Sequence, residues 1–400
     1  MLRRFFIGAA ALVILSSVLL RGVYLYLSYS MPPYRGSVGS ENHNQKITGL
    51  YLVKESAKRE NSLIIYGSSE LRTLEISTHP ANFFKGGRSG FQVNLVGRGS
   101  CQALIHAISI AASGDSLTGK RVALITSPQS YAEEGIAPDM FMANFSPQQY
   151  LELIAAEDIP AEMKEYISAR VETLFFRYEN MAGVSPPDPA IKALASHAAS
   201  PTPLSSALDV ILTPYYALSR GLFDMKDLTL SARIIKSAEE DAPRQPPEEI
   251  DWAAEEETAI REAEAMTSSN GFGILDGYYA ANIGERLSRL ENRDKNLSYS
   301  VSEEYGDLRL LFEVCREKGI EPLFIHVPLH GAWSDYTGFL TERREEYYRN
   351  VNEIAKEYGI EVLDLTGREY DEYFLCDVMH LGWRGWLEVD RALIEYYYGG

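Results

Sequence analysis

The stretch SLIIYGSSEL, Ser62–Leu71, decides the expected fold. Its apolar part, Ser62–Tyr66, ends at Gly67, and a polar Ser-Ser pair follows at once. A run of this length bounded by glycine is typical of a buried strand that passes into a turn. The same pattern recurs four more times along the chain. The further runs are QVNLV (Gln92–Val96), RVALIT (Arg121–Thr126), PLFIHV (Pro322–Val327) and EVLDL (Glu361–Leu365).

These runs are β-branched or leucine-rich instead of alternating, which is typical of parallel strands covered on both faces. Helical patterns separate several of them, at Cys101–Ser113, Asp307–Lys318 and Thr341–Tyr358. Strand, helix, strand in this order implies right-handed crossovers. The sequence therefore predicts an α/β fold: a parallel sheet with helices on both faces. Residues of about 130–320 carry no convincing strand, and we expect a long helical insertion there, either a cap over the sheet or a subdomain.

The first 30 residues predict a membrane anchor. Arg3 and Arg4 precede an uncharged run, Phe5–Leu20, and tyrosines follow Arg21. A helix needs roughly 20 residues to cross the hydrocarbon core, so the span works if Arg21 reaches the far interface. A cleaved signal peptide is the alternative, but no small-residue cleavage pattern follows the apolar run. We therefore expect one N-terminal transmembrane helix.

The two arginines near the amino end favour a cytoplasmic N-terminus. We expect a single-pass protein of the cell membrane whose residues 31–400 form an extracellular α/β domain. A polar, glycine-containing linker of about Pro32–Gln45 would join the anchor to that domain.

The formal net charge of −18 argues against a nucleic-acid-binding protein, because phosphate contacts need clustered Lys and Arg, and no basic stripe is evident. The acidic charge is concentrated in residues 239–264, which hold eleven acidic residues against Arg244 and Arg261. This segment reads as a solvated helix face and loop. The three cysteines have no metal-ligand spacing, so neither a zinc site nor a disulfide framework is expected.

Reactive groups in an open parallel sheet gather outside the carboxyl ends of the strands. Here those positions hold Ser68 and Ser69, then Gly99, Gln129 and His330. A serine at a glycine-led turn into a helix has an exposed oxygen in the positive field of the helix N-terminus, which suits a nucleophile. The alternative is that Ser68 or Ser69 only caps the helix.

The stretch CDVMHLGWRGW, Cys376–Trp386, favours the nucleophile. A serine hydroxyl becomes nucleophilic when a base removes its proton, and imidazole suits that role at neutral pH. Asp377 lies three residues before His380, so its carboxylate can fold back and accept a hydrogen bond from the other ring nitrogen. We expect Ser69, His380 and Asp377 to meet at one edge of the sheet. A surface Asp–His pair is the alternative.

These features together resemble the SGNH (GDSL-like) hydrolase superfamily, whose fold is flavodoxin-like. More closely, the chain resembles the DltD family, which acts in D-alanylation of lipoteichoic acid at the outer surface of Gram-positive bacteria. The motifs that carry this resemblance are YGSSELR, VGRGSCQ, TSPQSY, GFGILDGYY, VPLHGAWSDYTG and DVMHLGWRGW.

The resemblance implies a role for each matching residue. Ser69 would be the nucleophile, His380 its base and Asp377 the residue that orients the base. Gly99 and Ser69 itself would offer backbone N–H groups to an oxyanion. Ser68 stands where the superfamily often has aspartate, and the asparagine of the superfamily's third motif has Gln129 as its nearest polar counterpart.

Several aromatic and histidine side chains have two readings each. Trp383 and Trp386 would line a substrate pocket or pack against the sheet. Trp333 and Tyr336 follow a strand end and are expected at a pocket rim. The metal-binding alternative for the pair His326 and His330, which flank Pro328, has poor geometry, so structural roles are favoured. Cys376 reads as a small packing residue.

The residues alone predict membrane-anchored, serine-based acyl transfer with no metal or organic cofactor, and the resemblance implies that the intermediate is D-alanyl-Ser69. The resemblance implies the partners: poly-glycerol-phosphate lipoteichoic acid as acceptor, a D-alanyl donor carrier and a membrane O-acyltransferase. A simple esterase or thioesterase is one alternative. A non-catalytic module that presents a carrier to a membrane acyltransferase is the other. The acidic segment is expected to face away from the substrate, because teichoic acid is a polyanion.

Overall fold

Five parallel strands form one sheet with the order β2-β1-β3-β4-β5. The protein is represented by a computed structural model that describes residues 15, 18–72, 76–241 and 246–399. The strands are β1 (Ser62–Tyr66), β2 (Gln92–Val96), β3 (Val122–Thr126), β4 (Leu323–His326) and β5 (Glu361–Asp364). Each lies within about one residue of its predicted bounds, so the α/β prediction with a parallel sheet is confirmed. The strand order is that of flavodoxin-like folds.

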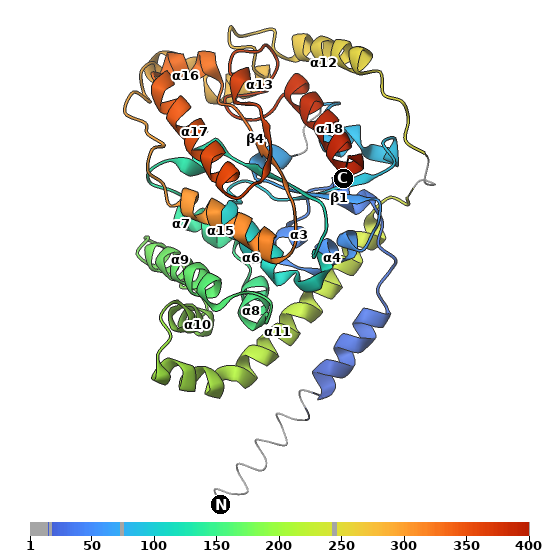
Figure 1. The fold of residues 1–400 in the computed structure, drawn as a ribbon, viewed down its shortest axis with the longest axis vertical. Helices are drawn as coiled ribbons and strands as arrows, with labels where there is room; N and C mark the ends of the chain where they lie inside the picture. Colours follow the sequence, from blue (N-terminus) through green and yellow to red (C-terminus); the bar gives the residue numbers. More distant parts are fainter. Residues whose placement is uncertain (1–14, 16–17, 73–75, 242–245, 400) are drawn as a thin grey trace, which may run out of the picture.

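Helices surround the sheet and fill the long interval between β3 and β4 (Figure 1). Before β3 the chain forms α2 (Ser37–Ser40), α3 (Asn44–Thr48), α4 (Tyr51–Ala57), α5 (Pro80–Phe83) and α6 (Ala103–Ala112). The interval before β4 holds α7 (Pro138–Asn144), α8 (Pro147–Ala155), α9 (Ala161–Glu179), α10 (Pro189–Ala199), α11 (Pro203–Ser237), α12 (Trp252–Met266), α13 (Asp276–Asn282), α14 (Leu287–Leu290) and α15 (Glu304–Glu317). The remaining helices are α16 (Gly331–Thr337), α17 (Thr341–Glu357) and α18 (Trp383–Tyr398). No strand occurs among the described residues of the interval between β3 and β4.

The two faces of the sheet pack into separate cores. In β1, Ile64 and Tyr66 contribute to a core built with α4, α6, α15 and α17, while Leu63 and Ile65 contribute to one built with α5 and α18. Successive side chains of a strand point to opposite faces, so an unbroken apolar run is needed where both faces are covered. This explains why the strand sequences do not alternate.

The parallel arrangement brings the carboxyl ends of all five strands to one edge of the sheet. Helix α16 follows β4 directly and marks this edge at the top of Figure 1, whereas α11 starts at the bottom of the view and the helix of residues 18–29 lies below the sheet. The residues that follow β1, β2 and β3 therefore share the upper edge with α16.

The predicted linker was wrong in part, because α2 and the start of α3 lie within it. Val38 is fully buried with Leu52, and Gly39 lies against β2. A Cβ atom on Gly39 would come within 2.4 Å of the Val93 carbonyl oxygen. The segment is thus packed on the sheet edge instead of spanning open solvent.

Most of the predicted membrane anchor lies outside the described residues, since only residue 15 and residues 18–20 of its apolar run are described. Residues 18–29 are helical. In the described part of the chain, no helix has the length and apolar character needed to cross a membrane. The anchor and the extracellular placement therefore stay predictions.

Candidate active site

Two glycines in contact shape the turn after β1. The Gly67 N–H donates to the Val96 carbonyl, and a Cβ on Gly97 would lie 1.8 Å from the Gly67 carbonyl oxygen. The ends of β1 and β2 can therefore approach this closely only without a side chain at Gly97. Ser68 and the short 3₁₀ helix Ser69–Leu71 follow, and the Ser68 N–H donates to Glu70 Oε1 over 2.8 Å.

A closed turn near the C-terminus carries the second part of the site. Leu375 and Leu381 pair as an isolated antiparallel bridge, and the Cys376 N–H donates to the His380 carbonyl over 2.9 Å. Gly382 continues this turn into α18, and a Cβ there would lie 2.7 to 2.8 Å from backbone atoms of residues 373–376. Gly382, the first glycine of the GWRGW motif, is thus required for the turn to close in this way.

The two turns bring Ser69, His380 and Asp377 into contact. Ser69 Oγ lies 2.8 Å from His380 Nε2, and His380 Nδ1 lies 2.7 Å from Asp377 Oδ2. An ionised carboxylate only accepts hydrogen bonds, so Nδ1 carries the proton and Nε2 is free to accept from the serine hydroxyl. The other oxygen, Asp377 Oδ1, accepts from the backbone N–H groups of Met379 and His380 at 2.9 Å each, which fixes the carboxylate.

Charge and burial act in opposite directions on this pair. Burial opposes protonation of His380, but the hydrogen bond and negative charge of Asp377 outweigh it, so the pKa of His380 is raised. Burial likewise disfavours the Asp377 anion, yet its bonds from His380 and Met379 hold the pKa of Asp377 below its usual value. The side chains of His380 and Asp377 keep 22% and 9% of their surface exposed, so solvent reaches the imidazole.

The capping alternative for the two serines is wrong. Ser68 stands at the N-cap position but its side chain makes no capping bond; its hydroxyl lies 3.4 Å from the Arg98 carbonyl. The Ser69 hydroxyl is paired with His380 instead. The expected helix start is also only one 3₁₀ turn, so a helix dipole adds little field at Ser69.

The turn after β2 holds the predicted oxyanion donor. The Asn144 side-chain amide donates to the Gly99 carbonyl over 3.1 Å and accepts from Arg98 Nε over 2.6 Å, so it fixes this turn. Gly99 has open space beside it, because an added Cβ would meet no atom within 4 Å. Gln129 follows β3 at the same edge, and its side chain is exposed. That Gly99 and Gln129 serve an oxyanion stays a prediction.

The aromatic residues predicted to line a pocket or its rim lie mainly in packed clusters. Trp383 has no exposed surface and packs with Ile76 and Cys376, and Trp386 packs edge-on against His79 with ring centroids 4.9 Å apart. A substrate contact with Trp383 would require this region to open. Trp333 is 7% exposed and stacks with Tyr336, with ring centroids 5.9 Å apart. Their predicted contact with substrate is untested.

Sequence reasoning missed Glu70 and left His330 without a defined role. Glu70 is 6% exposed; burial raises the pKa of its carboxyl group, and its charge favours the protonated form of His380. His330 accepts from the Trp333 N–H at Nδ1 and lies 2.9 Å from the Phe272 carbonyl at Nε2, so it caps α16. The position of Glu70 next to Ser69 was a signal, but only the fold shows its carboxylate turned inward.

The remaining histidine and cysteine groups near the strand ends are structural. His326 Nδ1 lies 2.8 Å from Asn352 Oδ1 inside the core. Cys376 is fully buried, and burial raises the pKa of its thiol well above the usual value, so the thiolate form is disfavoured. Among the described residues, no group of three or more His, Cys, Asp or Glu side chains is arranged to hold a metal ion.

The acidic segment lies beside the site-bearing turn. Helix α12 packs through Ala259 and Ala263 on Cys376 and Trp383. Glu256 of this helix pairs with Arg384 at 3.1 Å, which offsets part of the negative charge. That its other carboxylates face away from the substrate stays a prediction.

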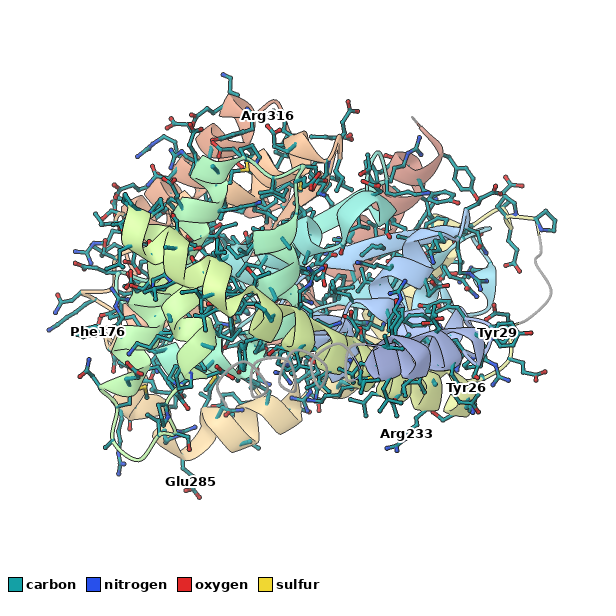
Figure 2. All side chains as sticks on the ribbon, turned by 90° about the horizontal axis from the view of Figure 1, so that it is seen from below. Tyr26, Tyr29, Phe176, Arg233, Glu285 and Arg316 are labelled. Carbon is teal, nitrogen blue, oxygen red and sulfur yellow. The ribbon has the colours of Figure 1, made fainter. Side chains whose placement is uncertain are left out.

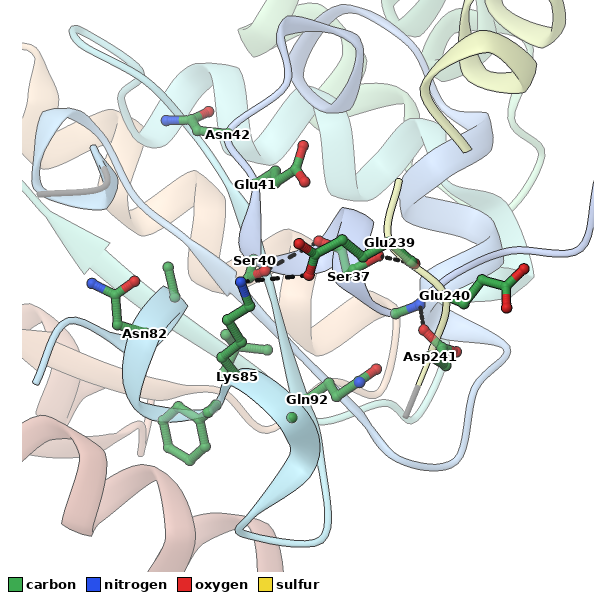
Figure 3. Close-up of a pocket in the computed structure, with 15 residues that line it drawn as sticks. Ser37, Ser40, Glu41, Asn42, Asn82, Lys85, Gln92, Glu239, Glu240 and Asp241 are labelled. Carbon is green, nitrogen blue, oxygen red and sulfur yellow. Dashed lines mark hydrogen bonds and ion pairs between the residues drawn. The ribbon is translucent and has the colours of Figure 1, made fainter. Parts of the chain in front are cut away.

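Two hollows differ in their relation to this edge. One of about 470 Å³ lies among α2, α5 and residues 239–241, where Lys85 pairs with Glu239 at 3.5 Å (Figure 3). It adjoins Gln92, the first residue of β2, and therefore lies at the opposite edge of the sheet from Ser69. A second hollow of about 330 Å³ includes His330 and Leu375 and lies at the carboxyl edge.

Comparison with known proteins identifies the family. The family model described as DltD protein matches residues 39–398. The chain is 34% identical to Protein DltD of Bacillus subtilis (strain 168) over 356 residues, which cover 88% of this chain and 86% of the relative. The chain belongs to the DltD family. Within that family, it is 26% identical to Protein DltD of Staphylococcus aureus (strain NCTC 8325 / PS 47), covering 84% of this chain and 81% of the relative. It is 24% identical to Protein DltD of Lacticaseibacillus rhamnosus, covering 85% and 78%.

Proposed function

We propose that this DltD-family chain is a serine-dependent acyl transferase that acts in D-alanylation of lipoteichoic acid at the outer surface of the cell membrane. The observation that carries the proposal is the continuous contact from the Ser69 hydroxyl through His380 to Asp377. Membership of the DltD family supports D-alanine as the acyl group and teichoic acid as the acceptor. An SGNH-type site is consistent with the strand order and with this contact.

The proposed first half-reaction acylates the serine. His380 Nε2 takes the Ser69 hydroxyl proton as Oγ bonds to the carbonyl carbon of a D-alanyl ester or thioester. The Nδ1–H bond to Asp377 keeps the imidazole in the required tautomer and stabilises its positive charge. The oxyanion would be met by the backbone N–H groups of Ser69 and Gly99. The bond to the leaving group then breaks, and the proton passes from His380 to the departing oxygen or sulfur.

The second half-reaction transfers the acyl group. A glycerol hydroxyl of the polymer bonds to the acyl carbon while its proton moves to His380 Nε2. The ester bond to Ser69 breaks, and the serine oxygen recovers that proton. The donor would arrive on a carrier through a membrane O-acyltransferase, and no metal or organic cofactor enters either step.

The test is the D-alanine ester content of lipoteichoic acid in cells whose own copy of this gene is deleted. Cells that express Ser69→Ala should match the deletion, while the native chain and the loop control Ser298→Ala should restore the ester content. Equal melting temperatures of the purified variants would show that Ser69→Ala folds. Full D-alanylation with Ser69→Ala would contradict the proposal and favour the non-catalytic presenting module.

Transfer and hydrolysis are separated with the purified full chain. A D-alanyl thioester is supplied with and without a glycerol-phosphate polymer, and the fate of the alanine is followed. The proposal expects polymer-bound D-alanine to form at the expense of free D-alanine. Release of free D-alanine at the same rate with and without the polymer would identify a simple thioesterase.

A further inference from the structure

One side of α11 carries an exposed apolar stripe. The members share one helix face because they repeat at intervals of four and three residues. They are Leu204, Leu208, Ile211, Tyr215, Leu218 and Leu222, and all are exposed. At about 1.5 Å per residue the stripe is roughly 27 Å long. Exposed apolar surface of this extent on one face marks an interaction site.

The charged residues of this half of the helix point the other way. Asp209 accepts from His197 of α10 at 2.8 Å, and Arg220 makes two bonds with Glu152 of α8 at 2.8 and 2.7 Å. Figure 1 shows α8 and α10 above α11, so these contacts turn the stripe toward the lower side of the molecule. This half of the helix therefore does carry charged residues, but they lie on the face that contacts α8 and α10, and the apolar residues lie on the exposed face.

The same face becomes basic toward the C-terminal end of α11. Continuing the spacing from Leu222 gives Lys226, Thr229, Arg233 and Lys236. Within α11, all of which the structure describes, no acidic residue interrupts this face, although the chain has a net charge of −18. The face thus combines an apolar half with a cationic half, which suits an anionic lipid surface.

The exposed N-terminal helix leaves the fold at the basic end of α11. Met31 and Tyr34 pack in one cluster with Ile234 and Ile235. The C-terminal end of the helix of residues 18–29 therefore lies beside that end of α11. Figure 2, which views the molecule from below, shows Tyr26 and Arg233 on this same side. Tyr26 and Tyr29 are largely exposed, as are Leu19 and Leu25.

We propose that this face of α11, with its apolar stripe and its basic half, lies on the outer surface of a lipid bilayer. Its apolar half would enter the boundary between headgroups and acyl chains, and Lys226, Arg233 and Lys236 would meet anionic headgroups. A bilayer fits better than a protein partner because the helix of residues 18–29, with its exposed Leu19, Leu25 and Tyr26, leaves the fold on this side. The carboxyl edge with Ser69 lies at the opposite side of the molecule, so the bilayer contact leaves that edge open.

The test uses the full chain in vesicles of phosphatidylglycerol and phosphatidylcholine in equal parts. Ile211→Cys is labelled with an environment-sensitive nitrobenzoxadiazole dye, and Val210→Cys is the matched control. Ile211 and Val210 are 71% and 73% exposed, but they point about 100° apart around the helix. The three native cysteines are buried, and the native chain serves as the labelling blank.

The dye at position 211 should shift its emission to the blue and lose intensity to lipids with a quencher on the acyl chain, and the dye at position 210 should do so less. Emission at position 211 typical of water would overturn the proposal. A blue shift at position 211 without lipid quenching would also overturn it, because the covering surface would then be protein.

A second comparison tests the basic half. Vesicles of phosphatidylcholine alone should quench the dye at position 211 less than vesicles with phosphatidylglycerol. The combined variant Lys226→Gln, Arg233→Gln and Lys236→Gln should remove that difference. Equal quenching of the native-charge protein in both lipids would overturn the role given to the three cations.

Discussion

The Ser69 hydroxyl and the His380 imidazole are held by turns more than 300 positions apart in the chain. On the imidazole side, Asp377 acts twice: one oxygen accepts from the ring and the other from the backbone. The ring position therefore depends on backbone hydrogen bonds as well as on the ion pair. This gives the histidine a defined tautomer before any substrate is present.

Activity should rise with pH through the pKa of His380, because only the neutral imidazole takes the serine proton. That pKa is raised in the folded chain, since Asp377 outweighs the effect of burial. The stability that the Asp377–His380 pair adds is therefore full below the unfolded pKa of histidine and is lost as pH rises through the folded pKa.

In Asp377→Asn we expect kcat/KM to fall by roughly 10³- to 10⁴-fold and the acid limb of the pH profile to move to lower pH. Measuring kcat/KM for an ester across pH checks both, and an unmoved acid limb would contradict the role of Asp377.

Glu70→Gln separates the charge of Glu70 from its shape. The amide oxygen still accepts from the Ser68 N–H, so folding should be retained. Loss of the negative charge should lower the pKa of His380 and move the acid limb of kcat/KM to lower pH, with a smaller loss of rate than in Asp377→Asn. An unchanged pH profile would show that Glu70 is neutral in the folded protein and only supports the turn.

The sequence allowed Ser69, Asp377 and His380 to be named because two local rules met: the strand-end position and the i, i+3 spacing. It did not reveal Asn144, whose amide holds the turn at Gly99 from a helix 45 positions later. Nothing in the local pattern around Asn144 indicates that contact. It arises only when α7 packs beside the end of β2.

At the scale of elements, Gly382 controls how the site-bearing turn enters α18. In Gly382→Ala the new Cβ would meet backbone atoms of residues 373–376, so we expect a loss of about 1–3 kcal/mol in the free energy of unfolding. Gly367→Ala, where a Cβ meets no atom within 4 Å, is the matched control. Urea unfolding measures both, and equal stabilities would show that the turn tolerates a side chain.

A buried cation joins α17 to the segments after β4 and β5. The Arg344 side chain is fully buried and lies 3.0 Å from Asp335 and 3.3 Å from Glu369. Arg344→Met leaves Glu369 without its cation, and we expect a loss of about 3–5 kcal/mol in the free energy of unfolding. The half-exposed pair of Arg293 with Asp294 is the control, and Arg293→Met should cost less than about 1 kcal/mol. A cost for Arg344→Met as small as that of the control would contradict this.

The strands were predicted to within about one residue because each apolar run stops at Gly, Pro or a polar residue. The helix ends were less predictable. Helix α15 begins at Glu304, three residues before the predicted start, and the Glu304 carboxylate accepts from the Ala103 N–H at 3.0 Å. A buried acidic residue that pairs with a distant backbone group looks like a surface residue in the sequence. The short helices α2 and α3 in the expected linker were not predicted either, because Val38 and Gly39 pack against segments that are distant in the chain.

At the scale of the whole molecule, the parallel direction of the strands followed from the order of strands and helices, and the strand order β2-β1-β3-β4-β5 agrees with the flavodoxin-like fold that the resemblance implied. The sequence did not predict α11 as one continuous helix, because Pro214 lies inside it and a proline usually indicates a break. Its contacts with α8 and α10 keep the chain helical through the proline. The consequence is a molecule with two unlike ends: Ser69 and its partners at the carboxyl edge, and the apolar and basic stripe of α11 at the other.

The most direct test of the central claim is mass spectrometry of the full chain after treatment with a fluorophosphonate, which bonds to activated serines. We predict one adduct, on Ser69, that is absent in Ser69→Ala and strongly reduced in His380→Ala, while the loop control Ser298→Ala is labelled like the native chain. An unmodified Ser69, or an adduct on another serine that persists in Ser69→Ala, would contradict it.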